Sequence, residues 1–275
     1  MFKKFLLFVK EFVKVFNKNS IPRASAALSY YLTFSVFPLI ICLYTLLGSN
    51  YQRAVDALGF ISRLWTPQVI GIVNDFMDYV YTSYSNAMLA AGLAVLITSA
   101  SAAFRSIQAT IGDMQGGQRF QGFMYFIFSI VFSLMFLAGI YFSLLVILLG
   151  KDILALINSV VPFVDISSSW NWLRFLLLGG IFFLLIWAIY VLSKRKTDRY
   201  RTFPGAFAAA IGIVVMSLVF SIFIGASAKY PLVYGSLASI ILLMFWLFIC
   251  CQIIYIGAAL NIALRNYREK NGKYD

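Results

Sequence analysis

Apolar residues in this chain gather in long runs that short polar segments separate. Six runs reach about 20 residues or more, the length that a helix needs to cross the hydrocarbon core of a bilayer. They cover residues 26–48, 86–111, 122–149, 172–193, 204–228 and 235–264. The pattern predicts an all-α, polytopic integral membrane protein with six transmembrane helices in a single membrane domain over residues 1–275.

Residues 1–18 show a different periodicity, because apolar side chains recur every three or four positions and lysines fall largely between them. The apolar positions are Phe2, Phe5, Leu6, Val9, Phe12, Val13 and Phe16. Such spacing predicts an N-terminal amphipathic helix in the membrane interface, with its lysines toward anionic headgroups. A cytoplasmic helix packed on the bundle is the alternative.

The first loop between spans, residues 49–85, is long enough to carry structure of its own. After Pro67 its apolar residues keep helical spacing, which predicts one or two short amphipathic helices on the outer surface. A folded lid over an outer ligand site is the alternative.

Composition strengthens the membrane assignment, since 62% of the residues are hydrophobic and only 12% are charged. The formal net charge is +12, a value that suggests nucleic acid as a partner in a soluble protein. Here 17 of the 22 basic residues fall on one side of the six spans, including the tail 265–275. The positive-inside rule therefore predicts a plasma-membrane protein with both termini in the cytoplasm and no nucleic-acid partner.

The sequence contains few of the residues that enzyme active sites commonly use. The chain has no histidine, and its ten acidic residues are scattered, mostly in loops. Histidine-carboxylate metal sites and Ser-His-Asp catalysis are excluded on those grounds, and no GxxxxGK[ST] loop is present. Cys42, Cys250 and Cys251 lie in apolar runs and are expected to be packing residues. We expect no catalytic residues, no metal and no cofactor.

Polar residues inside the spans are the candidates for binding. The second run is rich in small residues, which let helices approach closely, and its last turns become polar. Arg105 in those turns either binds an anion or snorkels and pairs with Asp113. Gln252 and Asn261 in the sixth run either bind substrate or bridge helices. The candidate substrate-binding residues are Arg105, Gln108, Asp113, Tyr30, Tyr31, Gln252 and Asn261.

Prolines and glycines are expected to shape the helices. Pro38 predicts a kink in the first span, with the hydroxyls of Thr33 and Ser35 available to the freed backbone groups. Pro204 suits the first turn of the fifth span. The helix-shaping set is Pro38, Pro204, Gly205, Gly235 and Gly257.

Five short segments in this order resemble the YihY/BrkB family of bacterial inner-membrane proteins, over about residues 10–265. The segments are Ala26-Ala27-Leu28-Ser29-Tyr30-Tyr31 with Phe37-Pro38-Leu39, Phe203-Pro204-Gly205-Ala206, Tyr234-Gly235-Ser236-Leu237-Ala238, and Gly257-Ala258-Ala259-Leu260-Asn261. The resemblance implies a six-helix plasma-membrane protein concerned with transport or envelope lipids. Ala259 stands where the family usually has an acidic residue. The family's older ribonuclease BN label conflicts with the missing histidines.

These features predict a transporter or flippase-like protein for an amphiphilic, anionic envelope molecule such as a lipid. Its expected partners are membrane lipids with anionic headgroups at the cytoplasmic face, and the sequence leaves a homo-oligomer open. A scaffold that organises envelope proteins without transport is the alternative. An ion or small-solute channel is a third hypothesis, against which the nearly charge-free apolar runs argue.

Overall fold

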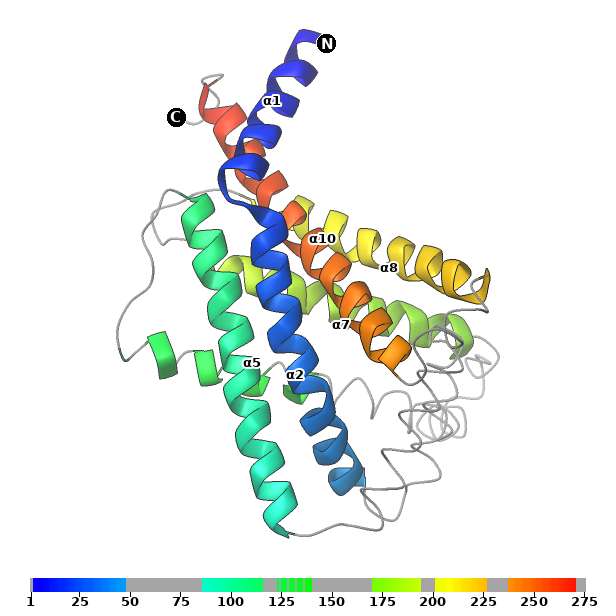
Figure 1. Cartoon of the computed structure of the whole chain (residues 1–275). Helices are drawn as coiled ribbons and strands as arrows, with labels where there is room; N and C mark the ends of the chain where they lie inside the picture. The colour runs from blue at the N-terminus through cyan, green and yellow to red at the C-terminus, as the bar shows by residue number, and fades with distance from the viewer. Residues whose placement is uncertain are drawn as a thin grey trace, which may run out of the picture.

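The chain folds into long helices that pack around a single C-terminal helix, α10 (Figure 1). The computed structural model describes residues 2–47, 86–115, 170–193, 201–226 and 237–270, together with scattered positions between 123 and 139. Its helices are α1 (Phe2–Lys18), α2 (Ile21–Leu47), α5 (Asn86–Met114), α7 (Trp170–Leu192), α8 (Phe203–Ala226) and α10 (Leu237–Lys270). The described positions between 123 and 139 are also helical. The predicted all-helical fold is confirmed for this part of the chain.

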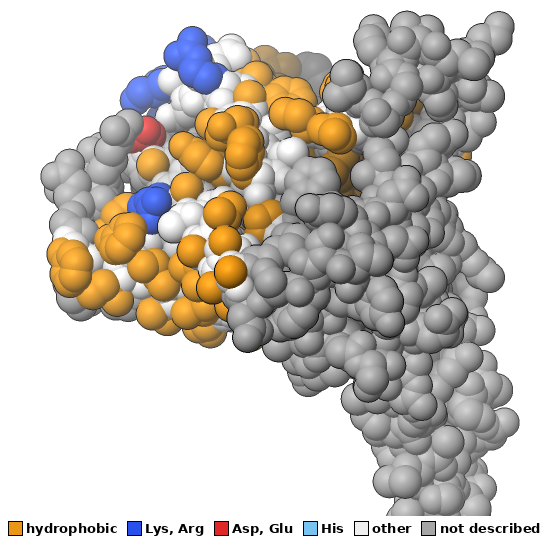
Figure 2. Space-filling model, turned by 60° about the horizontal axis from the view of Figure 1, so that its bottom comes forward, with side chains coloured by type: hydrophobic (Ala, Val, Ile, Leu, Met, Phe, Trp, Pro, Cys, Tyr) orange, Lys and Arg blue, Asp and Glu red, His pale blue; other side chains and the backbone are white. Residues whose placement is uncertain are grey.

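Three of the described helical segments are long and apolar enough to cross a membrane. They are Ala90–Met114, Phe203–Phe220 and Ile240–Lys270. Their surfaces also suit lipid, because many large apolar side chains are exposed (Figure 2). Six spans remain the prediction for the whole chain, and the expected helices of 49–85, as well as Gly235, lie outside the described residues.

Among the described helices, α10 packs against the largest number of neighbouring helices. It packs against α8, α2, α1 and, over a smaller area, α5, while α2 packs along α5 and α7 along α8. At 1.5 Å per residue, its 34 residues extend about 50 Å, which is longer than the hydrocarbon core. Its C-terminal end therefore projects from the other helices together with α1 (Figure 1).

Helix α1 lies against that projecting end of α10. Lys270 forms an ion pair with Glu11, and the ring of Phe8 meets that of Tyr267 edge-on, with 6.4 Å between centroids. Phe12 and Phe16 are partly buried against the core. The apolar stripe of α1 thus faces α10 in part, and its location in the membrane interface stays a prediction.

A sharp turn joins α1 to α2. The Asn19 side-chain amide donates to the Val15 carbonyl oxygen at 2.6 Å and closes the end of α1. Ser20 has a φ of 46°, in the left-handed region that non-glycine residues seldom adopt. Its carbonyl oxygen accepts the first backbone hydrogen bond of α2, from Arg23 at 2.9 Å. Pro22 follows in the first turn, where its missing N–H costs nothing.

Pro38 lies within α2, and the helix continues on both sides of it to Leu47. The hydroxyl of Thr33 donates to the Ser29 carbonyl oxygen at 2.8 Å, and that of Ser35 to the Leu32 carbonyl oxygen at 2.7 Å. Neither bonds to the carbonyl of Phe34, the group that Pro38 leaves without its N–H donor. The predicted role of these two hydroxyls at the freed group is therefore wrong.

Candidate functional site

The N-terminal end of α8 is bound to α10 by one amide side chain. Asn261 accepts a hydrogen bond from the Gly205 backbone N–H at 2.7 Å and donates to the Thr202 carbonyl oxygen at 2.9 Å. Both contacts are buried. The Gly205 N–H is one of the groups that a helix N-terminus leaves open, whereas the Thr202 carbonyl oxygen also accepts from the Ala206 N–H at 3.2 Å. Asn261 therefore bridges helices, which was the alternative to substrate binding.

Two glycines allow this close approach of α8 and α10. A Cβ built on Gly257 would lie 2.6 Å from the Gly205 carbonyl oxygen and 2.6 Å from the Tyr190 hydroxyl. That hydroxyl donates to the Ile254 carbonyl oxygen at 2.5 Å and so ties α7 to the same place. The predicted helix-shaping role of Gly205 and Gly257 corresponds here to contact between two helix backbones.

Arg105 is held by the helical positions that follow α5. Its guanidinium donates to the Ser129 hydroxyl at 3.1 Å and lies over the ring of Phe126, 5.2 Å from the centroid. The Tyr125 hydroxyl donates to the Arg105 carbonyl oxygen at 3.1 Å. These contacts connect α5 to the next helical segment and engage both the side chain and the backbone of Arg105.

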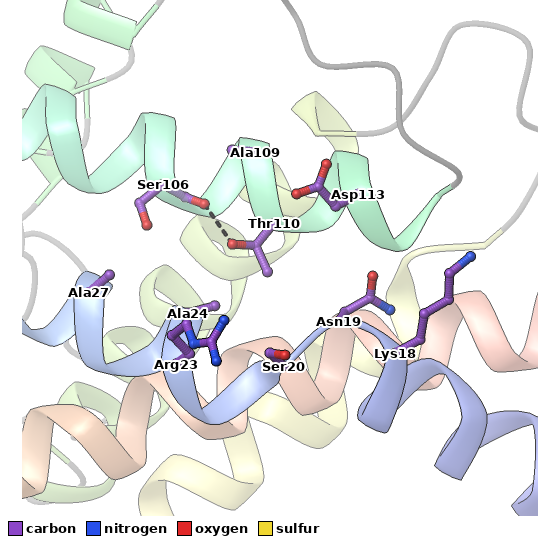
Figure 3. Close-up of a pocket in the computed structure, with 10 residues that line it drawn as sticks. All are labelled: Lys18, Asn19, Ser20, Arg23, Ala24, Ala27, Ser106, Ala109, Thr110 and Asp113. Carbon is purple, nitrogen blue, oxygen red and sulfur yellow. Dashed lines mark hydrogen bonds between the residues drawn. The ribbon is translucent and has the colours of Figure 1, made fainter.

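A pocket of about 720 Å³ lies where the α1–α2 turn faces the last turns of α5 (Figure 3). The turn and α2 contribute one wall, and a single face of α5 contributes the other. The residues that line it are Lys18, Asn19, Ser20, Arg23, Ala24, Ala27, Ser106, Ala109, Thr110 and Asp113. The short side chains of the three alanines leave space between the two walls. Small residues at this place therefore border a pocket instead of bringing the two helices into close contact.

The lining of this pocket carries a net positive charge from two cations and one carboxylate. Lys18 ends α1, and Arg23 lies in the first turn of α2, so the turn at Ser20 brings the two cations to one pocket. The N-terminus of α2 adds the partial positive charge of a helix dipole. An anionic group of small-molecule size fits both the charge and the volume.

The predicted binding residues separate into groups. Asp113 lines the pocket, whereas Gln108 is buried outside the lining and Gln252 is half-buried on α10. Tyr30 and Tyr31 lie further along α2, with their ring centroids 5.8 Å apart. The structure thus does not bring the seven predicted residues into one site.

Six polar or charged lining residues were missed by sequence reasoning. They are Lys18, Asn19, Ser20, Arg23, Ser106 and Thr110. The available signal was the pair of basic residues on either side of a helix break that Asn-Ser and Pro22 mark. Their position opposite α5 depends on the turn geometry and could not be seen in the sequence.

Other chemistry has less support in the described ranges. They contain no group of three or more histidine, cysteine, aspartate or glutamate residues that could hold a metal ion. Cys250 and Cys251 are buried, as expected of packing residues.

Comparison with known proteins agrees with these membrane-type helices. The chain is 26% identical over 266 residues to the ribonuclease-like protein YfkH of Bacillus subtilis (strain 168), which covers 96% of both chains. It is 25% identical over 278 residues to a UPF0761 membrane protein of Actinobacillus pleuropneumoniae serotype 5b (strain L20), which covers 97% of both. No solved structure matches the chain.

A family model described as virulence factor BrkB matches residues 12–275, nearly the whole sequence. The resemblance found in the five short segments is therefore confirmed over almost the full length. The chain belongs to the BrkB family of membrane proteins.

Proposed function

We propose that this protein binds an anionic amphiphile of the bacterial envelope, such as a phospholipid, and moves it from one leaflet to the other. The observation that carries the proposal is the basic pocket between the α1–α2 turn and α5. Its cations would hold the headgroup at the membrane surface, where basic residues meet anionic lipid. The orientation expected from the sequence makes this the cytoplasmic surface.

Helix α2 offers a path for the acyl chains of such a ligand. Arg23, Ala27, Tyr30 and Phe34 follow one another at spacings of three and four, so they share one face of the helix. Tyr30 is 50% exposed and Phe34 is 54% exposed, with 4.8 Å between their ring centroids. A headgroup bound at Arg23 would therefore have its chains beside an exposed aromatic track that remains in contact with lipid.

A transfer assay in proteoliposomes tests the proposal. Purified protein would be reconstituted with fluorescent phosphatidylglycerol, and movement between leaflets would be followed by chemical quenching of the outer label. We expect transfer above that of empty liposomes, and a reduction of about a hundredfold or more for the double variant Lys18→Gln/Arg23→Gln, because each charge-assisted contact contributes about 1.5–3 kcal/mol and every 1.4 kcal/mol is a factor of ten.

Lys14→Gln is the matched control, because Lys14 is an exposed lysine of α1 that does not line the pocket. It should transfer lipid at the rate of the unmodified protein. Transfer equal to that of empty liposomes would refute the proposal. Stable copurification with other envelope proteins under those conditions would favour the scaffold instead.

A further inference from the structure

The pocket contains more hydroxyl groups than a simple anion requires. Its volume of about 720 Å³ lies within the range of about 300–1,000 Å³ that is usual for organic ligands. Besides the two cations, Ser20, Ser106 and Thr110 contribute hydroxyls to the lining. None of the ten described lining residues is aromatic, so these residues form no cage of the kind that recognises quaternary ammonium groups. The lining therefore favours a headgroup with hydroxyls over one with choline.

Thr110 has a defined hydrogen-bonding role toward this space. Its hydroxyl donates to the Ser106 backbone carbonyl oxygen at 2.9 Å (Figure 3). A hydroxyl has one hydrogen and two lone pairs, so the capacity that remains to Thr110 is that of an acceptor. A ligand hydroxyl can donate to it, whereas a phosphate oxygen that carries no proton cannot.

Tyr255 of α10 lies behind these two residues. Its hydroxyl is beside the side chains of Ser106 and Thr110, and the residue is 0% exposed. Among the described residues this hydroxyl forms no hydrogen bond of normal geometry. A buried polar group without a partner is costly, and this hydroxyl lies close enough to Thr110 and Ser106 to donate to either of them. A small rotation of Thr110 or Ser106 toward a ligand would let Tyr255 donate to that hydroxyl and fix its orientation.

We infer that the pocket binds a phosphate ester of a polyhydroxy group, such as a phosphoglycerol or phosphosugar headgroup. The phosphate lies at Arg23 and the N-terminus of α2, and Lys18 adds positive charge from the other end of the pocket (Figure 3). A hydroxyl of the polyol donates to Thr110, and Tyr255 acts as a positioning residue behind it. The lipid origin of this headgroup rests on the proposed function, whereas its chemistry rests on the pocket.

Calorimetric titration of the full-length protein in phosphatidylcholine nanodiscs tests the inference. The probes are sn-glycerol 3-phosphate, inorganic phosphate, phosphocholine and phosphoethanolamine. We expect sn-glycerol 3-phosphate to bind about tenfold more tightly than each of the others, because only it carries alcohol hydroxyls beyond its phosphate group without adding a cation to a positive pocket. Equal affinity for sn-glycerol 3-phosphate and either phosphocholine or phosphoethanolamine would overturn the inference.

Substitutions separate the two halves of the site. Thr110→Val and Tyr255→Phe should each remove most of the preference for sn-glycerol 3-phosphate over inorganic phosphate while leaving phosphate affinity unchanged. Thr110→Ser should keep the preference for sn-glycerol 3-phosphate. Arg23→Gln should lower the affinity for sn-glycerol 3-phosphate and for inorganic phosphate by the same factor. A Thr110→Val variant that retains the full preference contradicts the assignment, whatever happens to Tyr255→Phe.

Phosphatidylglycerol added to the nanodiscs distinguishes this inference from the proposed function. Competition with sn-glycerol 3-phosphate supports a lipid ligand. Selective binding without competition, combined with no lipid transfer in liposomes, supports the pocket chemistry and refutes the proposed function. Lipid transfer without selective binding overturns the inference alone.

Discussion

Replacement of Gly205 by alanine tests whether contact between α8 and α10 holds the fold together. A Cβ at this position would lie 2.5 Å from the Asn261 side-chain nitrogen and still closer to the Gly257 carbonyl oxygen. Ordinary van der Waals contact begins near 3.4 Å, so the helices must separate or Asn261 must move. Backbone atoms cannot yield as the end of a flexible side chain can.

The expected cost follows from the contacts that this shift removes. Loss of the two hydrogen bonds of Asn261 costs about 1 kcal/mol each, and overpacking adds about 1–3 kcal/mol. Alanine regains about 0.5–1 kcal/mol over glycine in a helix. The net change is a loss of about 3 kcal/mol in the free energy of unfolding.

Unfolding by SDS in mixed micelles, followed by far-ultraviolet circular dichroism, measures this change. Gly179→Ala is the control, because nothing lies within 4 Å of a Cβ there, and it should be neutral or slightly stabilising. Gly212→Ala should fall between the two, because its Cβ meets one side-chain methyl, Cγ2 of Ile253, at 2.9 Å and no backbone atom. If Gly205→Ala unfolds at the same SDS fraction as Gly179→Ala, the helix contact does not carry the stability assigned to it.

Three further substitutions compare how much individual contacts of α10 contribute to the free energy of unfolding. Each is measured by the same unfolding assay. Asn261→Ala should cost about 2 kcal/mol, because it removes two buried hydrogen bonds and leaves the Gly205 N–H without its partner; a loss below that of Tyr190→Phe would contradict this role. Tyr190→Phe removes one hydrogen bond and should cost about 1 kcal/mol. Glu11→Gln breaks the ion pair with Lys270 and should change stability by less than about 1 kcal/mol; a larger loss would show that α1 is held mainly by charge.

Much of the fold was predictable because apolar runs end at charged or turn-forming residues. The predicted run 172–193 corresponds to α7, Trp170–Leu192, and the run 204–228 to α8, Phe203–Ala226. The expected end of the last span at 264 was six residues short of Lys270, where α10 ends. The last six residues of α10 are mostly polar or charged, and their contact with α1 supports the helix there. A pattern of apolar residues cannot reveal such a contact.

The candidate site was predictable only in part. Asp113 was identified as a polar residue near a helix end, but its neighbours Lys18 and Arg23 come from a different part of the chain. Their meeting depends on the left-handed conformation of Ser20, which serine adopts only where the surrounding structure requires it. Single-sequence periodicity contains no information about that turn.

The two sides of α10 explain how one helix serves both stability and binding. Gly257 and Asn261 lie on the side that contacts α8, whereas Tyr255 points toward Ser106 and Thr110 of α5. Because α8 fixes the first side through direct backbone contact, α10 provides an immobile support behind the pocket. The opposite wall, formed by the α1–α2 turn and α2, faces α5 across the pocket. That wall carries both cations, so under the proposed function it would hold the headgroup.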